Sequence, residues 1–381
     1  MFRPFNFVST NIGDLEQIFF ITKNRRSLYT EVHYPLRKIP PKKLDEYLAE
    51  GWFRMGQTIF TCWFLFMERG FYSAIWIRQD LENFTFKKRS RKIMNRNGRA
   101  FTYKIGSAVI DRPKEILYQK HRVRFNSGGV YRSLRQSLLS GASFSIYDTR
   151  QIEIYDGDKL IAASFFDVGQ ESVASISGLF DPAYGQHSLG FYTMLLEMQF
   201  SLDQGKRFYY PGYIVPGNPR FDYKARIGAV DYYNLYSKKW YPLEDMDVQQ
   251  IPSSLLRGKL DTLKFYLDKK GIESEIFYFP PYESAGIDPL LEDLLKHPMY
   301  LRCISTKFRH FDLFAVYDLV AQKYQLGIYY NLDDFSDWMA NKDAQAEGPF
   351  SYSIYMLGEV ISEKDTPKGM ADDVYEFIHG S

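Results

Sequence analysis

The sequence predicts an α+β protein with helices packed on a mixed sheet, and this prediction rests on three features of its middle third. Strands are expected where β-branched and aromatic residues are frequent, at residues 144–155, 159–168, 172–180 and 206–214. Between the first two, Asp156-Gly157 is a strong signal for a two-residue hairpin. Between the last two, a helix is expected from Ser188 to about Asp203. A meander of strands, then a helix and a further strand, is typical of a sheet covered by helices.

The chain is longer than one compact core of typical size. Its 381 residues, of which 45% are hydrophobic and 25% charged, provide apolar material for more than one core. We expect an N-terminal α+β lobe over residues 1–83 and a sheet domain with a basic entry segment over residues 84–243. A C-terminal extension is expected over residues 244–381, where residues 253–270 have the pattern of a helix.

The expected N-terminal lobe combines one helix with several strands. Residues 28–37 favour a strand, and residues 42–50 favour a short helix that ends at Gly51. The runs 52–66 and 70–78 are rich in aromatic and β-branched residues and indicate further strands.

Charge and cysteine content exclude several classes of function. The chain has 48 basic and 46 acidic residues, so its net charge of +2 would not draw it onto nucleic acid, and any such contact needs a local patch. Cys62 and Cys303 are too few for a disulfide framework and lack the spacing of a zinc or iron–sulfur site, so no metal is expected. The N-terminus lacks a secretory signal pattern, and no window of about 18 apolar residues could span a membrane. We therefore expect a cytoplasmic protein.

The densest run of charge lies at residues 84–99, which include no acidic residue. Its basic members are Lys87, Lys88, Arg89, Arg91, Lys92, Arg96 and Arg99. Such a run is typical of a contact with a phosphate backbone, and it is also typical of a solvated helix face.

Three blocks of sequence resemble the arginyl-tRNA–protein transferases and follow the order of that family. The blocks are 89–97, 155–200 and 209–226. The middle block contains Asp181-Pro182, Tyr184 and Ser188-Leu189-Gly190 ahead of a helix, and the last contains the segments YYPGYI, PGNP and DYKAR. The resemblance extends from about Tyr29 to Leu243 and implies a GNAT-like sheet. The family's N-terminal lobe usually carries a cysteine cluster, of which only Cys62 is present here.

The resemblance implies an aminoacyltransferase. Such an enzyme takes an amino acid, arginine or leucine, from the end of a tRNA and passes it to the N-terminal α-amine of a protein, which is tagging of the N-degron type. No cofactor is implied, because the aminoacyl-tRNA is the co-substrate. An α-amine has a pKa of about 7.7–8.0, so a useful fraction is neutral at physiological pH. Positioning of the reactants and stabilisation of the oxyanion can then supply most of the rate.

The resemblance also implies where the reaction takes place. In a GNAT-like fold two neighbouring strands part, the acyl group lies in the gap, and the next helix begins beside it. Backbone amides at Ser188, Leu189 and Gly190 would suit the phosphate of the terminal adenosine or the oxyanion, and the side chain of Ser188 would otherwise only cap the helix.

Catalysis is expected from the segment after the Pro-Gly loop. Tyr223 could donate a proton to the leaving 3′ oxygen, Lys224 or Arg226 could bind phosphate, and Asp222 could hold a cationic group. A solvated loop with an Asp222–Arg226 ion pair is the alternative. Asp167 is out of pattern at the end of an apolar strand, where it could face the substrate or end the strand in a turn.

The remaining expected contacts are with the two substrates. Tyr184 and Tyr213 are expected to bind the acyl donor or the acceptor. Contacts to the tRNA, chiefly through its phosphates, are expected from Arg89, Arg91, Lys92, Arg96 and Asn97. His187 could act as a base, although a lone histidine is more often structural.

Two other functions stay open at this point. A GNAT-like fold also suits an acyl-CoA-dependent N-acyltransferase, because the fold alone does not determine the donor. The segment Gly185 to Gly190 departs from the glycine spacing of a pyrophosphate-binding loop, which disfavours CoA. The missing cysteines suggest a relative that binds RNA or N-terminal peptides without catalysis.

Overall fold

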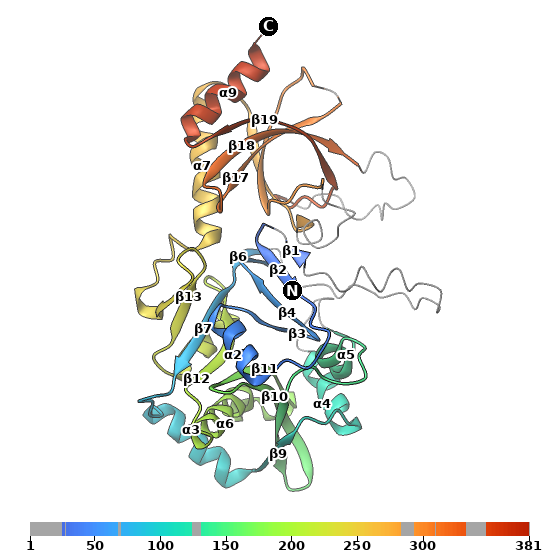
Figure 1. Cartoon of the computed structure of the whole chain (residues 1–381), viewed down its shortest axis with the longest axis vertical. Coiled ribbons are helices and arrows are strands. Elements are labelled where there is room, and N and C mark those ends of the chain that lie inside the picture. Colours follow the sequence, from blue (N-terminus) through green and yellow to red (C-terminus); the bar gives the residue numbers. More distant parts are fainter. Residues whose placement is uncertain are drawn as a thin grey trace, which may run out of the picture. The chain divides into compact units, whose positions relative to one another are not determined.

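The computed structural model describes residues 25–26, 28–67, 70–123, 131–282, 293–308, 310–332 and 348–380 (Figure 1). They belong to two compact units. The described residues of the first unit lie within Val32–Thr61 and Ala74–Met246, and those of the second within Arg25–Glu31, Cys62–Ser73 and Asp247–Ser381. The N-terminal lobe expected over residues 1–83 is not a separate unit, because its strands are divided between these two.

The first unit is built on an eight-stranded mixed sheet with the order β14-β13-β7-β12-β11-β10-β9-β8 (Figure 1). Its strands are β7 (Ile75–Asp80), β8 (Thr102–Ser107), β9 (Thr149–Asp156), β10 (Lys159–Val168), β11 (Ser172–Phe180), β12 (Phe208–Ile214), β13 (Asp231–Asn234) and β14 (Lys239–Pro242). Neighbours are antiparallel except β11 and β12, which are parallel. The predicted α+β class is confirmed.

The predicted strands and hairpin of the middle third are confirmed. Asp156 pairs with Lys159 across the β9–β10 turn, and Gly157 adopts the positive φ of 57° that this turn requires. The strands expected at 159–168 and 172–180 have the predicted bounds. The run expected to begin at residue 144 becomes a strand only at Thr149.

Helices cover both faces of this sheet. They are α2 (Pro41–Ala49), α3 (Lys88–Ala100), α4 (Arg112–Arg122), α5 (Leu134–Leu139) and α6 (Leu189–Asp203). Alternate residues of β10 face opposite sides of the sheet. Phe165 joins a core with α4 and α5, whereas the ring of Phe166 lies 5.1 Å from that of Phe200 on α6. Since α3 packs on α6 in turn, α6 is buried along most of its length.

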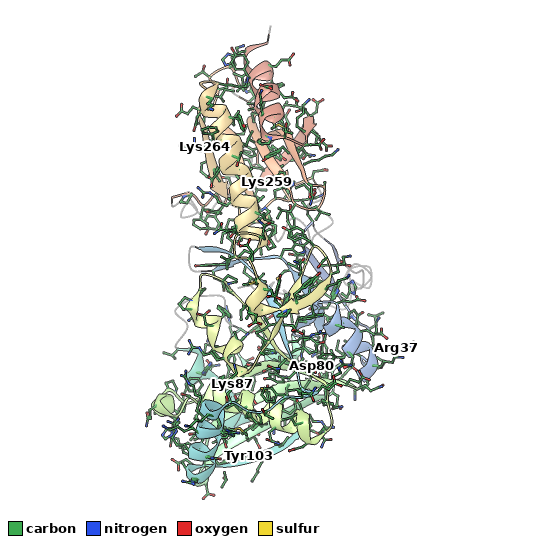
Figure 2. All side chains as sticks on the ribbon, turned by 90° about the vertical axis from the view of Figure 1, so that its left-hand side faces the viewer. Arg37, Asp80, Lys87, Tyr103, Lys259 and Lys264 are labelled. Carbon is green, nitrogen blue, oxygen red and sulfur yellow. The ribbon has the colours of Figure 1, made fainter. Side chains whose placement is uncertain are left out.

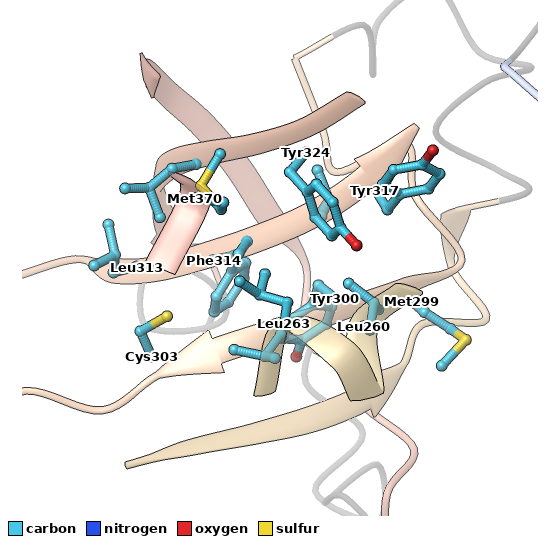
Figure 3. Close-up of a cluster of buried hydrophobic side chains, with 14 of the residues drawn as sticks. Leu260, Leu263, Met299, Tyr300, Cys303, Leu313, Phe314, Tyr317, Tyr324 and Met370 are labelled. Carbon is cyan, nitrogen blue, oxygen red and sulfur yellow. The ribbon is translucent and has the colours of Figure 1, made fainter. Parts of the chain in front are cut away.

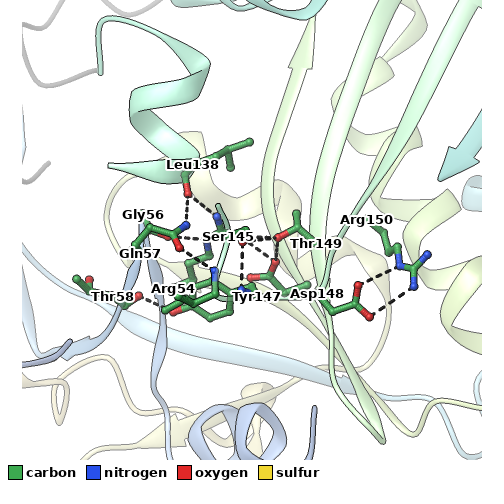
Figure 4. Close-up of polar contacts among 12 residues, drawn as sticks. Arg54, Gly56, Gln57, Thr58, Leu138, Ser145, Tyr147, Asp148, Thr149 and Arg150 are labelled. Carbon is green, nitrogen blue, oxygen red and sulfur yellow. Dashed lines mark hydrogen bonds and ion pairs between the residues drawn. The ribbon is translucent and has the colours of Figure 1, made fainter. Parts of the chain in front are cut away.

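The hairpin of β3 (Phe53–Met55) and β4 (Thr58–Cys62) is tied to the sheet through a buried arginine. Arg54 donates to the carboxylate of Asp167 and to the hydroxyl of Thr149, each at 2.8 Å (Figure 4). It also donates to the carbonyl of Leu138 on α5, and its guanidinium lies 4.5 Å from the centre of the Tyr147 ring. The side chains of Arg54 and Asp167 are only 2% and 1% exposed.

The second unit has a five-stranded antiparallel sheet with the order β15-β16-β17-β18-β19. Its described elements are β1 (Arg25–Arg26), β2 (Thr30–His33, shared with the first unit), β5 (Phe64–Met67), β6 (Gly70–Ser73), β15 (Ser274–Tyr278), β16 (Met299–Cys303), β17 (Asp312–Asp318), β18 (Lys323–Asn331), β19 (Tyr355–Lys364), α7 (Pro252–Lys269) and α9 (Pro367–His379). The helix expected at 253–270 is therefore confirmed as α7.

Residues from α7, α9 and the sheet form the core of the second unit (Figure 3). Leu260 and Leu263 of α7 and Met370 of α9 pack against buried side chains of β16 and β17, such as Tyr300 and Phe314. Among the described helices of the chain, none is long and apolar enough to cross a bilayer.

We expect Arg54→Met to lower the free energy of unfolding by about 3–5 kcal/mol at neutral pH, because it leaves the buried carboxylate of Asp167 without a cation. Arg150→Met is the matched control. It removes a cation from Asp148 in a pair that is 39% and 36% exposed, and should cost less than about 1 kcal/mol. Urea unfolding measures both variants. Equal losses in the two would show that the Arg54–Asp167 pair has no special weight.

Candidate active site

Strands β11 and β12 pair over only three residues each and then part. The parallel pairs are Ser172 with Phe208, Val173 with Tyr209, and Ala174 with Tyr210. Beyond the last pair, β11 has an extra residue, Ile176, relative to β10, and β12 has an irregularity between Tyr209 and Gly212 relative to β7. Such bulges bend a strand away from its partner. The gap expected of a GNAT-like sheet therefore opens after Ala174 and Tyr210.

Gly212 allows β12 to turn at this gap. Its φ of +97° is one that residues with a side chain rarely adopt, and a Cβ atom there would lie 3.1 Å from the Nζ of Lys224. The backbone of β12 and the ammonium of Lys224 are therefore in close contact beside the gap.

Lys224 comes from the 3-10 segment η2 (Pro219–Ile227) that follows the Pro-Gly loop. Its Nζ lies 4.9 Å from the centre of the Tyr213 ring and 5.6 Å from that of Phe221. Within the described ranges, no carboxylate forms an ion pair with Lys224. Burial lowers the pKa of its amine to about 8. The group can therefore be a cation that accepts an anionic ligand and can lose its proton near physiological pH.

The neighbours of Lys224 in η2 reach solvent. Asp222 and Arg226 are exposed. Among the described residues, these two do not form the ion pair that the sequence suggested as an alternative. Tyr223 is 39% exposed, yet burial, followed by the charge of Glu197, raises the pKa of its phenol. Tyr223 thus extends from the surface toward the interior, whereas Asp222 and Arg226 are available only at the surface.

Glu197 of α6 is a buried acid that the sequence pattern did not single out. It is 0% exposed, and the phenol of Tyr209 donates to its Oε2 at 2.7 Å. Burial raises the pKa of Glu197 to about 7, while Tyr209 and the hydroxyls of Ser164 and Ser175 act in the opposite direction. An acidic residue within the apolar run LLEMQF of the expected helix was the signal that could have identified it.

Helix α6 begins near Phe180, the last residue of β11, but without the predicted side-chain cap. Ser188 adopts left-handed backbone angles, φ 53° and ψ 44°, and makes no capping hydrogen bond through its side chain. Its carbonyl accepts from the amides of Phe191 and Tyr192. The amides of Leu189 and Gly190 lie before the first intrahelical bond and are the ones available to a ligand. The side chain of Leu189 is buried, so only its backbone could take part.

The basic run forms helix α3, and its residues divide between two roles. Lys87 precedes the first turn (Figure 2), and Arg89, Arg91 and Lys92 are exposed. In the part of the chain that is described, none of the basic residues from Lys87 to Arg99 forms an ion pair with an acid. Asn97, by contrast, does not have the exposed position expected of a residue that contacts tRNA.

The side chain of Asn97 is fully buried and donates to the carbonyl of His187 at 2.9 Å. Arg96 donates to the same carbonyl at 3.0 Å from an exposed position. Asn97 therefore holds the backbone just before α6 and cannot reach a tRNA phosphate from its buried site.

Two residues that were expected to contact a substrate, Asp167 and Tyr184, form contacts within the protein. Asp167 has no exposed surface and pairs with Arg54, so it does not face a ligand; burial raises its pKa, and Arg54 and Thr149 oppose this. Tyr184 donates to Asp156 at 2.8 Å and has Lys159 over its ring, which ties it to the β9–β10 hairpin. Among the described residues, no group of three or more His, Cys, Asp or Glu side chains is placed to hold a metal ion.

Comparison with known proteins gives similarity over the same region. Residues 108–234 match the family model described as arginine-tRNA-protein transferase, C terminus. An aspartate/glutamate leucyltransferase of Leptospira interrogans is 24% identical over 152 residues, covering 39% of this chain and 58% of that protein. One from Shewanella sp. (strain MR-4) is 30% identical, covering 39% and 62%, and one from Helicobacter hepaticus is 23% identical, covering 54% and 83%. The chain thus spans under two thirds of the first two relatives.

The solved structures that align with this chain do so with low TM-scores. The C-terminal domain of a putative lysylphosphatidylglycerol synthetase from Agrobacterium fabrum gives a TM-score of 0.34 at 16% identity, covering 44% of this chain and 57% of that one. FemX gives a TM-score of 0.31 at 9% identity, covering 50% and 64%.

The buried carboxyl of Glu197 predicts a pH dependence of stability. The pKa of Glu197 is about 7 in the folded state, against an ordinary value of 4.5. The contribution of this group to the free energy of unfolding is therefore fully present below pH 4.5 and is lost as the pH rises through 7. Between pH 4.5 and 8.5, we expect the free energy of unfolding of the wild type to fall by about 3 kcal/mol relative to Glu197→Gln. Urea unfolding across this range measures it, and a difference that does not change with pH would contradict it.

Proposed function

Since this chain is a member of the arginyl-tRNA–protein transferase family, we propose that it transfers an amino acid from aminoacyl-tRNA to the N-terminal α-amine of proteins. The observation that carries the proposal is the parting of β11 and β12 with Lys224 at its edge. A gap of this kind holds an acyl group, and a desolvated lysine with no acidic partner in the described residues suits the charge that develops during acyl transfer.

The reaction needs few groups beyond those at the gap. The neutral α-amine attacks the carbonyl carbon of the ester, a C–N bond forms, and the C–O bond to the tRNA breaks as its 3′ oxygen takes a proton. We assign the oxyanion to the ammonium of Lys224 and to the amides of Leu189 and Gly190. Tyr223 lies beside Lys224 in η2 and is the candidate donor to the 3′ oxygen.

The names of the relatives suggest the substrates. Proteins called aspartate/glutamate leucyltransferases support leucine as the transferred residue, with arginine as the other candidate, and acceptors that begin with Asp or Glu. Arg226 is exposed two residues beyond Lys224 and suits the side-chain carboxylate of such an acceptor. The product would be a tag of the N-degron type, made in the cytoplasm where charged tRNA is available.

Helix α3 is the candidate contact for the tRNA. Arg89 and Lys92 are three residues apart and therefore neighbours on one exposed face. Their charges have no acidic partner among the described residues, so phosphates can bind them without displacing an existing ion pair.

A transfer assay with labelled leucine or arginine on tRNA tests the activity. Peptides that begin with Asp, Glu or Lys serve as acceptors, and acetyl-CoA is run in parallel. We expect label in the Asp and Glu peptides from charged tRNA, and a loss of about 10- to 100-fold in kcat/KM in Lys224→Ala, the size of a lost hydrogen bond to a charged group. Lys239→Ala, an exposed lysine on β14, is the control and should retain activity. Label from acetyl-CoA alone would reject this function.

The double variant Arg89→Ala, Lys92→Ala tests the role of α3. We expect weaker tRNA binding, with the slope of log affinity against log salt reduced by about 1 for each phosphate contact removed. Lys238→Ala, Lys239→Ala removes the same charge from exposed positions at the start of β14 and should leave the slope unchanged. Filter binding from 50 to 200 mM salt compares them. Equal slopes in both double variants would place the tRNA elsewhere.

A further inference from the structure

Strand β8 forms one edge of the eight-stranded sheet. It pairs with β9 in a regular register and, among the described strands, has no partner on its other side. Ala108, the residue after β8, donates its amide to the carbonyl of Thr149 on β9 at 3.0 Å. Because bonded and non-bonded pairs alternate along an antiparallel ladder, the amides and carbonyls of Tyr103, Ile105 and Ser107 point away from β9. No hydrogen bond between described residues satisfies these outward groups.

The side chains of β8 leave this edge poorly protected against pairing. Tyr103 and Ile105 are 46% and 40% exposed, and Figure 2 labels Tyr103. They pair with Ile154 and Ile152 of β9, which are fully buried, so an apolar row of the sheet continues to its edge. Natural sheets protect a free edge with charges, proline, bulges or very short strands. β8 has six residues, a regular register and a single charge, at Lys104, so it is suited to pairing with another strand.

Gly106 gives independent evidence that a second backbone approaches β8. Its φ is not in the left-handed region, so the conformation of the strand does not require glycine here. A Cβ atom at this position would meet nothing within 4 Å, so packing within the chain does not require glycine either. Glycine weakens the interior of a strand, and it often marks a place where another backbone or a ligand comes close. The open space at Gly106 can therefore receive a side chain from a partner.

The sequence of β8 is self-complementary in one antiparallel register. Residues whose main-chain groups point outward can exchange both hydrogen bonds only with one another. A two-fold axis through Ile105 meets this condition, because Ile105 then pairs with Ile105 of a second copy and Tyr103 pairs with Ser107. In the same register Lys104 lies opposite Gly106. Its side chain takes the open space at the glycine, and like charges do not face each other across the pair.

We propose that two copies of this chain associate through β8 and form a continuous antiparallel sheet across a two-fold axis at Ile105. A second copy fits this edge better than an unrelated extended peptide, because the outward main-chain groups, the apolar side chains, the lysine and the glycine all find their match in the same strand. The interface ends before Val109, whose amide already donates to the side chain of Gln151 at 2.9 Å. Since β9 and β10 separate β8 from β11 in the sheet, the inference does not depend on the proposed function.

Sedimentation velocity of the full chain tests the association. We expect the wild type to pass from monomer to dimer between about 1 and 100 µM, as for a small interface. Ile105→Lys and Ile105→Glu each place like charges opposite one another at the axis, so each should raise the dissociation constant about 10-fold or more. An equimolar mixture of the two variants should regain dimers, because each lysine then faces a glutamate. Tyr241→Lys, on the opposite edge strand β14 and 37% exposed, is the matched control and should associate like the wild type.

Cysteine substitutions test the register. Residues paired in this way have Cα atoms about 5.5 Å apart, within the range of a disulfide, so Ile105→Cys should give a covalent dimer on mild oxidation. Val109→Cys, 55% exposed but off the axis, should not cross-link, and the native Cys62 and Cys303 are buried. A wild type that stays monomeric throughout, or a dimer that Ile105→Lys does not weaken, would overturn the proposal. Cross-linking of Val109→Cys as readily as Ile105→Cys would overturn it too.

Discussion

The first unit depends on how briefly β11 and β12 pair. Three parallel pairs hold them together, and beyond these an extra residue in β11 and the turn at Gly212 in β12 separate the strands. Separation leaves backbone groups on both strands without a ladder partner, and such groups bind other donors and acceptors. The segment that follows β12 returns Tyr223 and Lys224 to this place, so a local defect in the sheet becomes a site with its own polar side chains.

Two buried acids in the first unit, Asp167 and Glu197, differ in whether a positive charge neutralises them. Asp167 is matched by Arg54, which also binds the carbonyl of Leu138 and so connects β3, α5 and β10. Glu197 is matched only by hydroxyl groups, and its carboxyl retains protons up to about neutral pH. Because the Arg54–Asp167 pair stabilises the fold, the fold can tolerate Glu197, whose surroundings do not stabilise the charged form of its carboxyl group.

The features that were predictable from sequence are those set by local periodicity and turn chemistry. The β9–β10 hairpin, the strands on each side of α6, and α7 follow from residues near one another in the chain. Asp167 was misjudged because its partner Arg54 is 113 positions away, and Asn97 because its acceptor, the His187 carbonyl, is 90 positions away. Glu197 was missed because burial of an acid depends on β10, β11 and β12 together, which no local pattern contains. β7 joins the sheet beside β12 for the same non-local reason, so the boundary expected at residue 83 does not exist.

Helix α3 links the exposed basic surface to the start of α6. Its buried side, with Ser90 and Asn97, faces inward, and Asn97 fixes the carbonyl of His187 one residue before Ser188. Its exposed side carries Arg89 and Lys92. Because one rigid helix has both sides, a phosphate backbone bound outside would be held at a defined distance from the free amides of α6. In the proposed function, the hydrogen bond from the buried Asn97 to the His187 carbonyl would fix the start of α6 relative to a tRNA bound on the outer side of α3.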